Sequence, residues 1–425
     1  MSKPTSDKLA IRGGPRTIPE GAIKPWPPID DTDREMVLAS LQGENHAFGP
    51  NCTAFEREFA AWNGNRFAIT TNSGTAALHM GIAACGLNAG DHVLVTSYSW
   101  SSSATCILHH NCIPVFVDID YNTMNMDVAK IEAAITPATK AIVAVHLHGL
   151  ALDMEKVMSV ARKHNLKVIE DACQSHGAQF QDRKVGSWGD CTAFSFNQNK
   201  CLCSGEGGMF VTDNEEILQK ARQLWSFGET RTPVESRDYH AYALGWMYRN
   251  NDLTAAFGRA QLAKLDRHLD IERENARVLL AKMKGIRGLI PPATPVNHWH
   301  TYYNFTSRID AAALGWSGEP ARLRDAIMQA LQAEGVPVGI WQAFILPAMT
   351  VFQAQNAYGH GCPWRCSHAK PVAYRVADYP VAQRHAETHF GMTTPLRAPN
   401  GPDVAERVGD AFQKVFANVG NLAVE

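Results

Sequence analysis

The sequence predicts an α/β fold, with a mostly parallel central sheet in a large domain and a smaller α+β domain at the C-terminal end. Between Arg66 and Val211, short β-branched runs alternate with helical patterns, which is typical of a parallel sheet covered by helices. The chain has 425 residues, which is long for one minimal core. The length therefore favours a large domain with a smaller one.

Individual elements are expected at defined places. The expected strands are residues 67–71, 92–95, 114–118, 141–146, 167–171, 192–196 and 209–211, and the expected helices are 75–85, 153–163 and 215–226. A helical stretch from residue 253 to about 280 leads toward the second unit, which contains a strand at 303–309 and helices at 320–334 and 402–416. Residues 355–400 are expected to be mostly loop. We predict an N-terminal arm (1–35), a large domain (36–270) and a smaller C-terminal domain (271–425).

The charge and hydropathy of the chain argue against several classes of function. The 40 Lys and Arg residues nearly balance the 42 Asp and Glu residues, so the chain lacks the basic surface that nucleic acid requires. No apolar segment has the length of a signal peptide or of a membrane span. We expect a soluble cytoplasmic protein that binds neither nucleic acid nor membrane.

The ten cysteines are scattered, which predicts reduced and mostly packed thiols rather than a disulfide framework. One cluster contains His360, Cys362, Cys366 and His368. It lacks paired Cys-x-x-Cys spacing and lies among loop residues, so structural or substrate-loop cysteines are favoured over a metal site. We expect no metal.

The first candidate site is Ser73-Gly74-Thr75, where a strand ends and a helix begins. A glycine lets the backbone approach a ligand closely, the two hydroxyls can donate hydrogen bonds, and a helix N-terminus offers free N–H groups to a phosphate. The alternative is an ordinary serine N-cap.

The second candidate is Asp171, at the end of an apolar strand and followed by Gln174. Ligands of open α/β sheets bind at this edge, where a carboxylate can keep a cofactor ring nitrogen protonated. The alternative is that Asp171 caps a following helix.

The third candidate is Lys200, which follows the strand that contains Ser195 and precedes the glycine-rich turn at Gly205-Glu206-Gly207-Gly208. A desolvated ammonium loses its proton more readily, and the free amine can form a Schiff base with an aldehyde. The alternative is a solvated surface lysine.

The fourth candidate is Trp100, which lies among serines after the strand that ends at Val95. Its indole can stack on a flat cofactor ring, or it can pack in the core, as tryptophans more commonly do.

In their order and spacing, these motifs resemble the DegT/DnrJ/EryC1/StrS aminotransferase family. The resemblance covers nearly the whole chain, including residues 9–14, 145–149 and 259–262. The Ser-x-Asn-Gln-Asn-Lys form of the lysine motif, with residues 301–303 and 362–364, is similar to the aminocyclitol branch, whose activity is glutamine-dependent amination of a keto-cyclitol such as scyllo-inosose.

The resemblance implies a fold type I transferase that uses pyridoxal 5′-phosphate (PLP). Lys200 would hold PLP as an imine, Asp171 would contact its ring nitrogen, Gln174 its ring hydroxyl and Trp100 its face, while Gly74, Thr75 and Ser195, beside Ser73, would hold the phosphate. It also implies ping-pong transfer of an amino group from glutamine or glutamate to a keto-cyclitol or keto-sugar, in a homodimer.

One segment departs from the family pattern. Where the family usually reads Gly-x-Asn-x-Arg, with the asparagine reaching across a dimer interface, this chain has Met247 between Gly245 and Arg249. A methionine cannot donate that hydrogen bond, and Asn250 or Asn251 is the candidate replacement.

Two other functions fit parts of the pattern. A PLP-dependent dehydratase or aromatising enzyme acting on an aminocyclitol-like ring is one, although the sugar dehydratases that resemble this family carry histidine where this chain has Lys200. The other is a regulatory protein, PLP-binding or cofactor-free, that has lost turnover, and only Met247 favours it.

Overall fold

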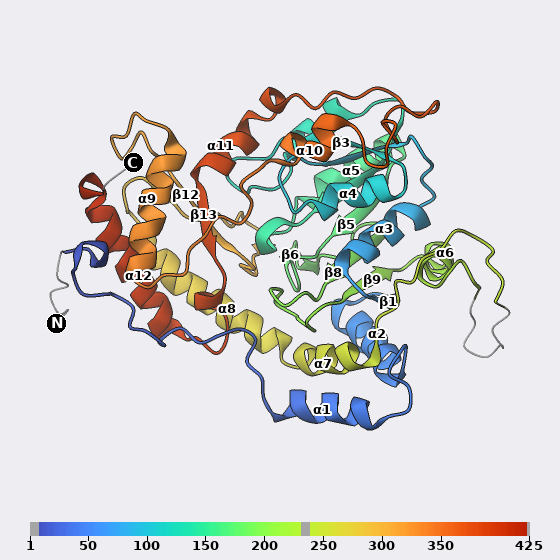
Figure 1. Cartoon of the computed structure of the whole chain (residues 1–425), viewed down its shortest axis with the longest axis horizontal. Coiled ribbons are helices and arrows are strands. Elements are labelled where there is room, and N and C mark those ends of the chain that lie inside the picture. Colours follow the sequence, from blue (N-terminus) through green and yellow to red (C-terminus); the bar gives the residue numbers. More distant parts are fainter. Residues whose placement is uncertain (1–7, 231–238, 423–425) are drawn as a thin grey trace.

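A seven-stranded sheet forms the centre of the larger of two units in the computed structural model, which describes residues 8–230 and 239–422 (Figure 1). The strand order is β1 (Phe67–Thr71), β9 (Gly208–Thr212), β8 (Cys191–Ser195), β5 (Lys167–Asp171), β4 (Thr139–Val145), β2 (His92–Thr96) and β3 (Ile113–Val117). Pairs from β8 to β3 are parallel, whereas β9 runs antiparallel to both β8 and β1. The predicted α/β class and mostly parallel sheet are confirmed.

Helices cover both faces of this sheet because its strands are apolar on both sides. In β2, Val93 and Val95 belong to one core and Leu94 to the other. The first core contains residues of α3 (Gly74–Ala84), α4 (Ser102–His109) and α6 (Glu215–Trp225). The second contains residues of α2 (Pro50–Asn63), α5 (Met154–His164) and α7 (Asp252–Leu262).

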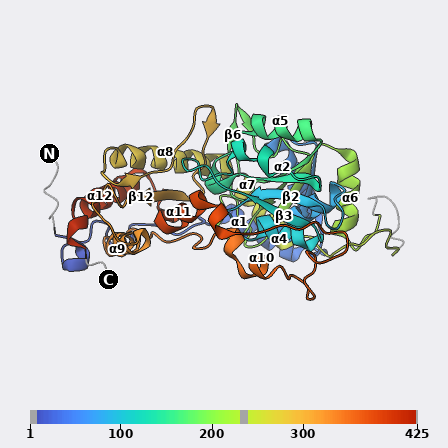
Figure 2. The ribbon, with the colours of Figure 1, turned by 90° about the horizontal axis from the view of Figure 1, so that it is seen from above.

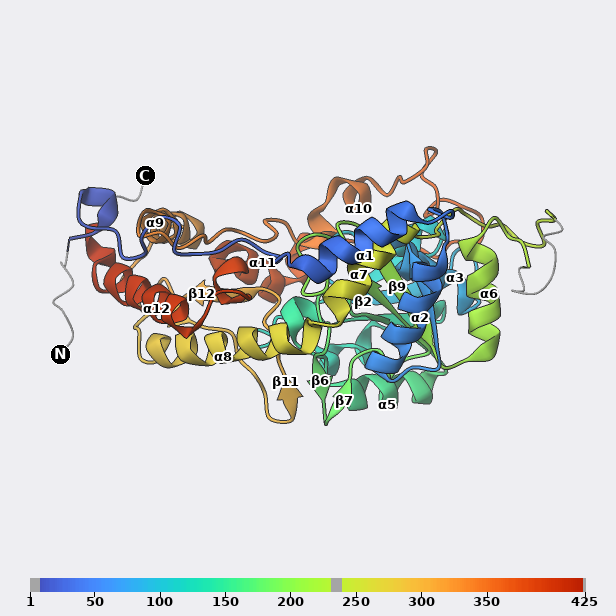
Figure 3. The same cartoon turned by 90° about the horizontal axis from the view of Figure 1, so that it is seen from below.

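The predicted helix at residues 253–280 is two helices, α7 and α8 (Leu265–Met283), which meet at Ala263 and Lys264. The sequence there has no glycine or proline, so its pattern gives no sign of the break. Lys264 is held by tertiary contacts, since its Nζ lies 2.6 Å from Asp33 of α1 (Asp31–Gln42). From this junction α8 runs into the second unit (Figure 3).

The second unit is an antiparallel sheet of β10 (Leu289–Ile290), β12 (Phe305–Ile309) and β13 (His389–Met392) with helices packed on it. Its core joins residues of α8, α9 (Pro320–Ala333) and α12 (Pro402–Ala417) to Leu9 and Ile18. Both ends of the described chain therefore lie at this unit (Figures 1 and 2). A small third sheet pairs β11 (His298–Trp299) with β6 (Gln179–Phe180) and β7 (Arg183–Lys184).

The expectation of a mostly loop-like segment at residues 355–400 is partly wrong. It contains α11 (Pro380–Thr388) and β13, and it follows α10 (Thr350–Ala354). His385 and His389 are fully buried and their rings stack 4.5 Å apart, so residues that look polar in the sequence serve as packing groups. Phe352, Trp364 and Tyr374, nearby in the chain, pack into the first core of the large sheet. Across residues 8–230 and 239–422, no helix combines the length and apolarity needed to cross a bilayer.

Candidate active site

The first turn of α3 lies against Ser195, at the end of β8, and Cys173, just after β5. Ser73 is its N-cap, with Oγ accepting from the backbone N–H of Ala76 at 3.1 Å, so the N-cap interpretation is confirmed. A Cβ on Gly74 would lie 2.7 Å from Cβ of Ser195 and 2.8 Å from Sγ of Cys173. The first N–H groups of a helix have no acceptor within it. Ser195 thus lies close to the free N–H groups of α3, which are of the kind that binds a phosphate.

Asp171 is a buried carboxylate at the carboxyl end of β5. Its Oδ2 accepts from the hydroxyl of Ser103 at 2.6 Å, and its Oδ1 accepts from the N–H of Cys173 at 3.2 Å. The aspartate caps a turn here, not the helix considered above. Within the described ranges Asp171 has no ion-pair partner, so a buried negative charge is available to a cationic ring nitrogen.

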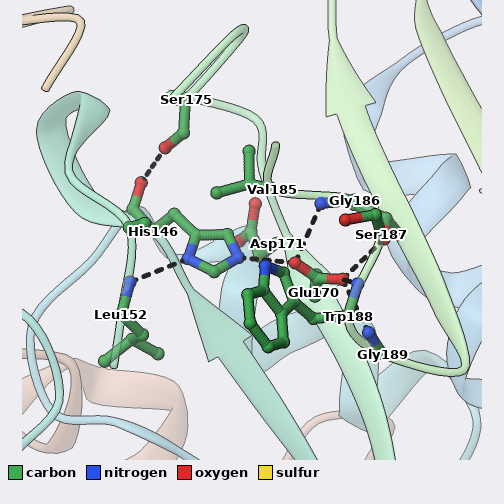
Figure 4. A network of polar contacts seen from close by, with 12 residues as sticks. His146, Leu152, Glu170, Asp171, Ser175, Val185, Gly186, Ser187, Trp188 and Gly189 are labelled. Carbon is green, nitrogen blue, oxygen red and sulfur yellow. Dashed lines mark hydrogen bonds and ion pairs between the residues drawn. The ribbon is translucent and has the colours of Figure 1, made fainter. Parts of the chain in front are cut away.

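Glu170, the neighbour of Asp171, lies at the centre of a buried polar network (Figure 4). One carboxylate oxygen accepts from Nε2 of His146 at 3.0 Å and from Gly186 N–H at 2.9 Å, and the other from the N–H groups of Trp188 and Gly189. Burial acts to raise the pKa of Glu170, but the hydrogen bond from His146 and the backbone donors outweigh it, so this pKa is lowered. The network fixes the end of β5.

The same network determines the tautomer of His146. Its Nδ1 accepts from the N–H of Leu152 at 3.0 Å, so the ring proton must be on Nε2, facing Glu170. Ser175 donates from its hydroxyl group to the carbonyl of His146, and Gln174 accepts from the N–H of His148 at 3.0 Å. The turn that contains Gln174 is therefore held against the end of β4.

Lys200 follows β8 and is half-buried, so it is not the solvated surface lysine considered above. Its Nζ lies 3.4 Å from the hydroxyl of Tyr303 and 4.7 Å from the centre of that ring. Trp26, from the N-terminal segment, donates from Nε1 to the carbonyl of Lys200 at 3.1 Å. The lysine is thus contacted by one segment far before it in the sequence and by another far after it.

Aromatic and imidazole rings lie beside these groups. Trp100 is 54% exposed, so the interpretation as a core residue is wrong. Trp341 lies 6.3 Å from Trp100 and 4.8 Å from His148, between ring centres. His148 is buried and neither ring nitrogen has a partner among the described residues. Burial first, and then the charges of His389 and His300, hold the pKa of His148 well below its usual range.

A buried arginine that the sequence did not reveal joins the lysine loop to the second unit. Arg397 donates to the carbonyl of Asn199 at 2.8 Å and to that of Tyr303 at 2.9 Å, and it contacts Glu272 at 3.4 Å. No local pattern marks this role, because all three partners lie far from Arg397 in the sequence.

The segment that departs from the family pattern lies beside the Ser73 turn. The carbonyl of Met247 accepts from Nδ2 of Asn72 at 3.2 Å, and its side chain is 50% exposed. Asn251 is the N-cap of α7. Asn250 is buried, with Oδ1 accepting from Thr254 at 2.6 Å and with Nδ2 lacking a partner within the described residues.

The Cys362 and Cys366 segment and two further polar side chains, His300 and Arg384, lie in different environments. Sγ of Cys362 and Sγ of Cys366 are 3.1 Å apart, and in the described part of the chain no three His, Cys, Asp or Glu side chains form a metal-binding group. His300 stacks on Tyr302 at 4.0 Å, and Arg384 lies 4.5 Å from the ring centre of Tyr121.

Comparisons with known proteins agree on one family. The DegT/DnrJ/EryC1/StrS aminotransferase family model matches residues 27–389. The spore coat polysaccharide biosynthesis protein SpsC of Bacillus subtilis is 37% identical, covering 92% of this chain and 95% of its own. The L-glutamine:2-deoxy-scyllo-inosose aminotransferase of Streptomyces kanamyceticus is 34% identical, covering 98% and 99%. GDP-perosamine synthase of Caulobacter vibrioides is 36% identical, covering 73% and 81%.

Solved structures give the same result. An aminotransferase from Psychrobacter cryohalolentis superposes with a TM-score of 0.80 at 28% identity, covering 94% of this chain and 100% of that one. 3-Amino-5-hydroxybenzoic acid synthase superposes with a TM-score of 0.81 at 26% identity, covering 93% and 99%. The chain therefore belongs to the DegT/DnrJ/EryC1/StrS family and is a PLP-dependent aminotransferase.

Proposed function

We propose that this aminotransferase moves an amino group from glutamine or glutamate to a keto-cyclitol or keto-sugar in two half-reactions, with Lys200 as the residue that bonds to PLP. The observation that carries the proposal is the buried Asp171 carboxylate, which has no ion-pair partner among the described residues and lies at the same sheet edge as the open N-terminus of α3. That combination suits a flat, cationic ring that bears a phosphate.

The proposal assigns each cofactor contact to residues that the structure describes. Bound PLP supplies an electron sink that makes the carbon carrying the amino group acidic. The N–H groups at Gly74 and Thr75, with the hydroxyls of Ser73 and Ser195, bind the phosphate in this proposal. Asp171 keeps the ring nitrogen protonated, Gln174 binds the ring hydroxyl, and the exposed indole of Trp100 covers the ring.

Lys200 provides the acid and base chemistry in this proposal. The free amine at Nζ would act first as a base and then as an acid: it would take the proton from Cα of the donor and deliver it back within the same half-reaction. Hydrogen bonds from Ser103 and from the N–H of Cys173 keep the carboxylate of Asp171 oriented while the proton moves. A keto acid leaves after the first half-reaction, and the ketone accepts the amino group in the second.

The substrate class rests on the relatives. Relatives named as scyllo-inosose aminotransferases and as a GDP-perosamine synthase suggest a polyhydroxylated ring ketone as acceptor. We further propose a homodimer in the cytoplasm. Large apolar side chains that are exposed in the single chain support the dimer: Leu38, Leu41, Leu244 and Met247.

A two-stage experiment tests this function. First, PLP is added to the wild type and to Lys200→Ala, and visible absorbance is recorded; absorbance of a PLP imine in the variant would show that another lysine bonds to PLP. Next, the loaded wild type is mixed with each amino acid and then with each ketone, and the conversion between PLP and its aminated form, PMP, is followed. Failure of glutamine and glutamate to produce PMP would contradict the donor assignment.

A further inference from the structure

Tyr303 makes two contacts with the amine of Lys200. Its hydroxyl lies 3.4 Å from Nζ, and the centre of its ring lies 4.7 Å from Nζ. A lysine amine in its charged form has three donors and no acceptor, so in this pair Lys200 donates and the phenol oxygen accepts. The face of the ring adds attraction for the ammonium form.

The phenol has little freedom to leave this position. Tyr303 is 5% exposed and packs in the second core, which also contains Phe196 and Leu202 on either side of the lysine. Its backbone carbonyl is bound by Arg397, and the same guanidinium binds the carbonyl of Asn199, next to Lys200. The planar guanidinium of Arg397 therefore sets the separation between the loop that carries Lys200 and the segment that carries Tyr303.

We infer that Tyr303 is a positioning residue that holds the Lys200 amine whenever this amine is not bonded to the cofactor. The inference rests on the proposed role of Lys200. In each half-reaction the free amine has to stay near the reacting carbon, and its four-carbon stem is otherwise flexible. Within residues 8–230 and 239–422, the hydroxyl of Tyr303 is the hydrogen-bond acceptor that Nζ contacts. Tyr303 thus keeps the nitrogen of Lys200 in place.

Tyr303→Phe is the direct test, because it removes the hydroxyl and keeps the ring. Tyr302→Phe is a matched control: Tyr302 is also buried, and its hydroxyl faces Thr294 at 3.1 Å instead of the lysine. With the cofactor-free proteins, we expect Tyr303→Phe to form the visible-absorbing imine with PLP about tenfold more slowly, the value of one hydrogen bond. Affinity for PMP, which forms no bond with a lysine, should stay at the wild-type value in both variants.

A second measurement examines the proton that Lys200 moves. With glutamine deuterated at Cα, or with glutamate if that is the donor, the kinetic isotope effect of the first half-reaction should be larger in Tyr303→Phe than in the wild type and Tyr302→Phe. A wild-type rate of PLP capture in Tyr303→Phe would overturn the inference, and so would an equal loss of PMP affinity, which indicates a merely structural role. Lys200→Ala distinguishes failure of the inference about Tyr303 from failure of the proposed function. Visible absorbance of a PLP imine in that variant would contradict the proposed role of Lys200 itself.

Discussion

The hydroxyl of Ser103 donates a 2.6 Å hydrogen bond to Oδ2 of Asp171, and Oγ of Ser99 lies 2.8 Å from Oγ of Ser103. This short chain of hydroxyls begins at Ser99, ahead of α4, passes through Ser103 on α4 and ends at the carboxylate of Asp171 on β5. It orients a buried charge that in our proposal faces the ring nitrogen of the cofactor.

Ser103→Ala should therefore slow the first half-reaction about three- to tenfold, because Oδ2 of Asp171 loses a partner worth roughly 0.5–1.5 kcal/mol. Single-turnover kinetics of PMP formation measure this effect. The control is Ser102→Ala, one residue earlier on α4 and partly exposed. Equal rates in the two variants would show that Ser103 does not support Asp171.

Gly74→Ala should destabilise the protein by about 1–3 kcal/mol through overpacking against Ser195 and Cys173. Helix propensity alone predicts that the same change raises the stability by about 1 kcal/mol. The sign of the measured change therefore shows whether overpacking or helix propensity dominates. Urea unfolding and the dissociation constant of PMP measure stability and site geometry. Gly420→Ala, where no atom lies within 4 Å of the added Cβ, should leave both unchanged.

Glu170→Gln should cost roughly 3–5 kcal/mol of stability, because an amide nitrogen replaces one acceptor in a pocket lined only by donors. The melting temperature and urea midpoint measure this loss. Glu155→Gln, at an exposed carboxylate that accepts from Gln181, is the matched control. A variant as stable as this control would show that the network in Figure 4 contributes little.

Acid should destabilise the protein below about pH 6.5. Burial above all holds the pKa of His385 well below its usual range and that of His389 at about 4. The unfolded chain binds these protons near pH 6.5 while the folded chain does not, so each such histidine stabilises the fold above that pH. This stability is lost as the pH falls, at about 1.4 kcal/mol per pH unit and residue.

His385→Phe removes one of these protons and keeps an aromatic ring between Tyr98 and His389. We expect the free energy of unfolding, measured from pH 7.5 to 5, to fall less steeply with pH than in the wild type. The difference in slope should correspond to about one proton fewer taken up on unfolding. His46→Gln, at an exposed position, should keep the wild-type slope. A wild-type slope in His385→Phe would mean that His385 is protonated in the folded state or neutral in both states.

The large sheet is predictable from the sequence because apolar runs with polar ends define its strands locally. The expected strands at 67–71 and 167–171 coincide with β1 and β5, and the others differ by one or two residues at their ends. The direction of β9 is not predictable in this way, since it depends on which strands it pairs with. The helices α1 and α2 and the strand β13 carry weak periodicity and were not expected. The domain boundaries at residues 35 and 270 remain a prediction.

In the candidate site, too, some residues can be predicted from the local sequence, whereas others depend on contacts with distant segments. Ser73, Asp171 and Lys200 stand out because each lies at the end of a strand or shortly after one, and strand ends are visible in a sequence. Tyr303, Arg397 and Trp341 do not stand out, since their role depends on contacts with segments more than ninety residues away. The cofactor contacts proposed for these side chains await the experiments above.

The backbone at Lys200 is held by Trp26 from the start of the chain, and the neighbouring carbonyl of Asn199 is held by Arg397 from near its end. During synthesis, the loop of Lys200 leaves the ribosome long before Arg397 does. The large sheet and the bond from Trp26 can form earlier, but the bond from Arg397 can close only after β13 and the segment behind it are made. Maturation of the lysine site is therefore a late event in folding, and a chain truncated before Arg397 would keep Lys200 without its support.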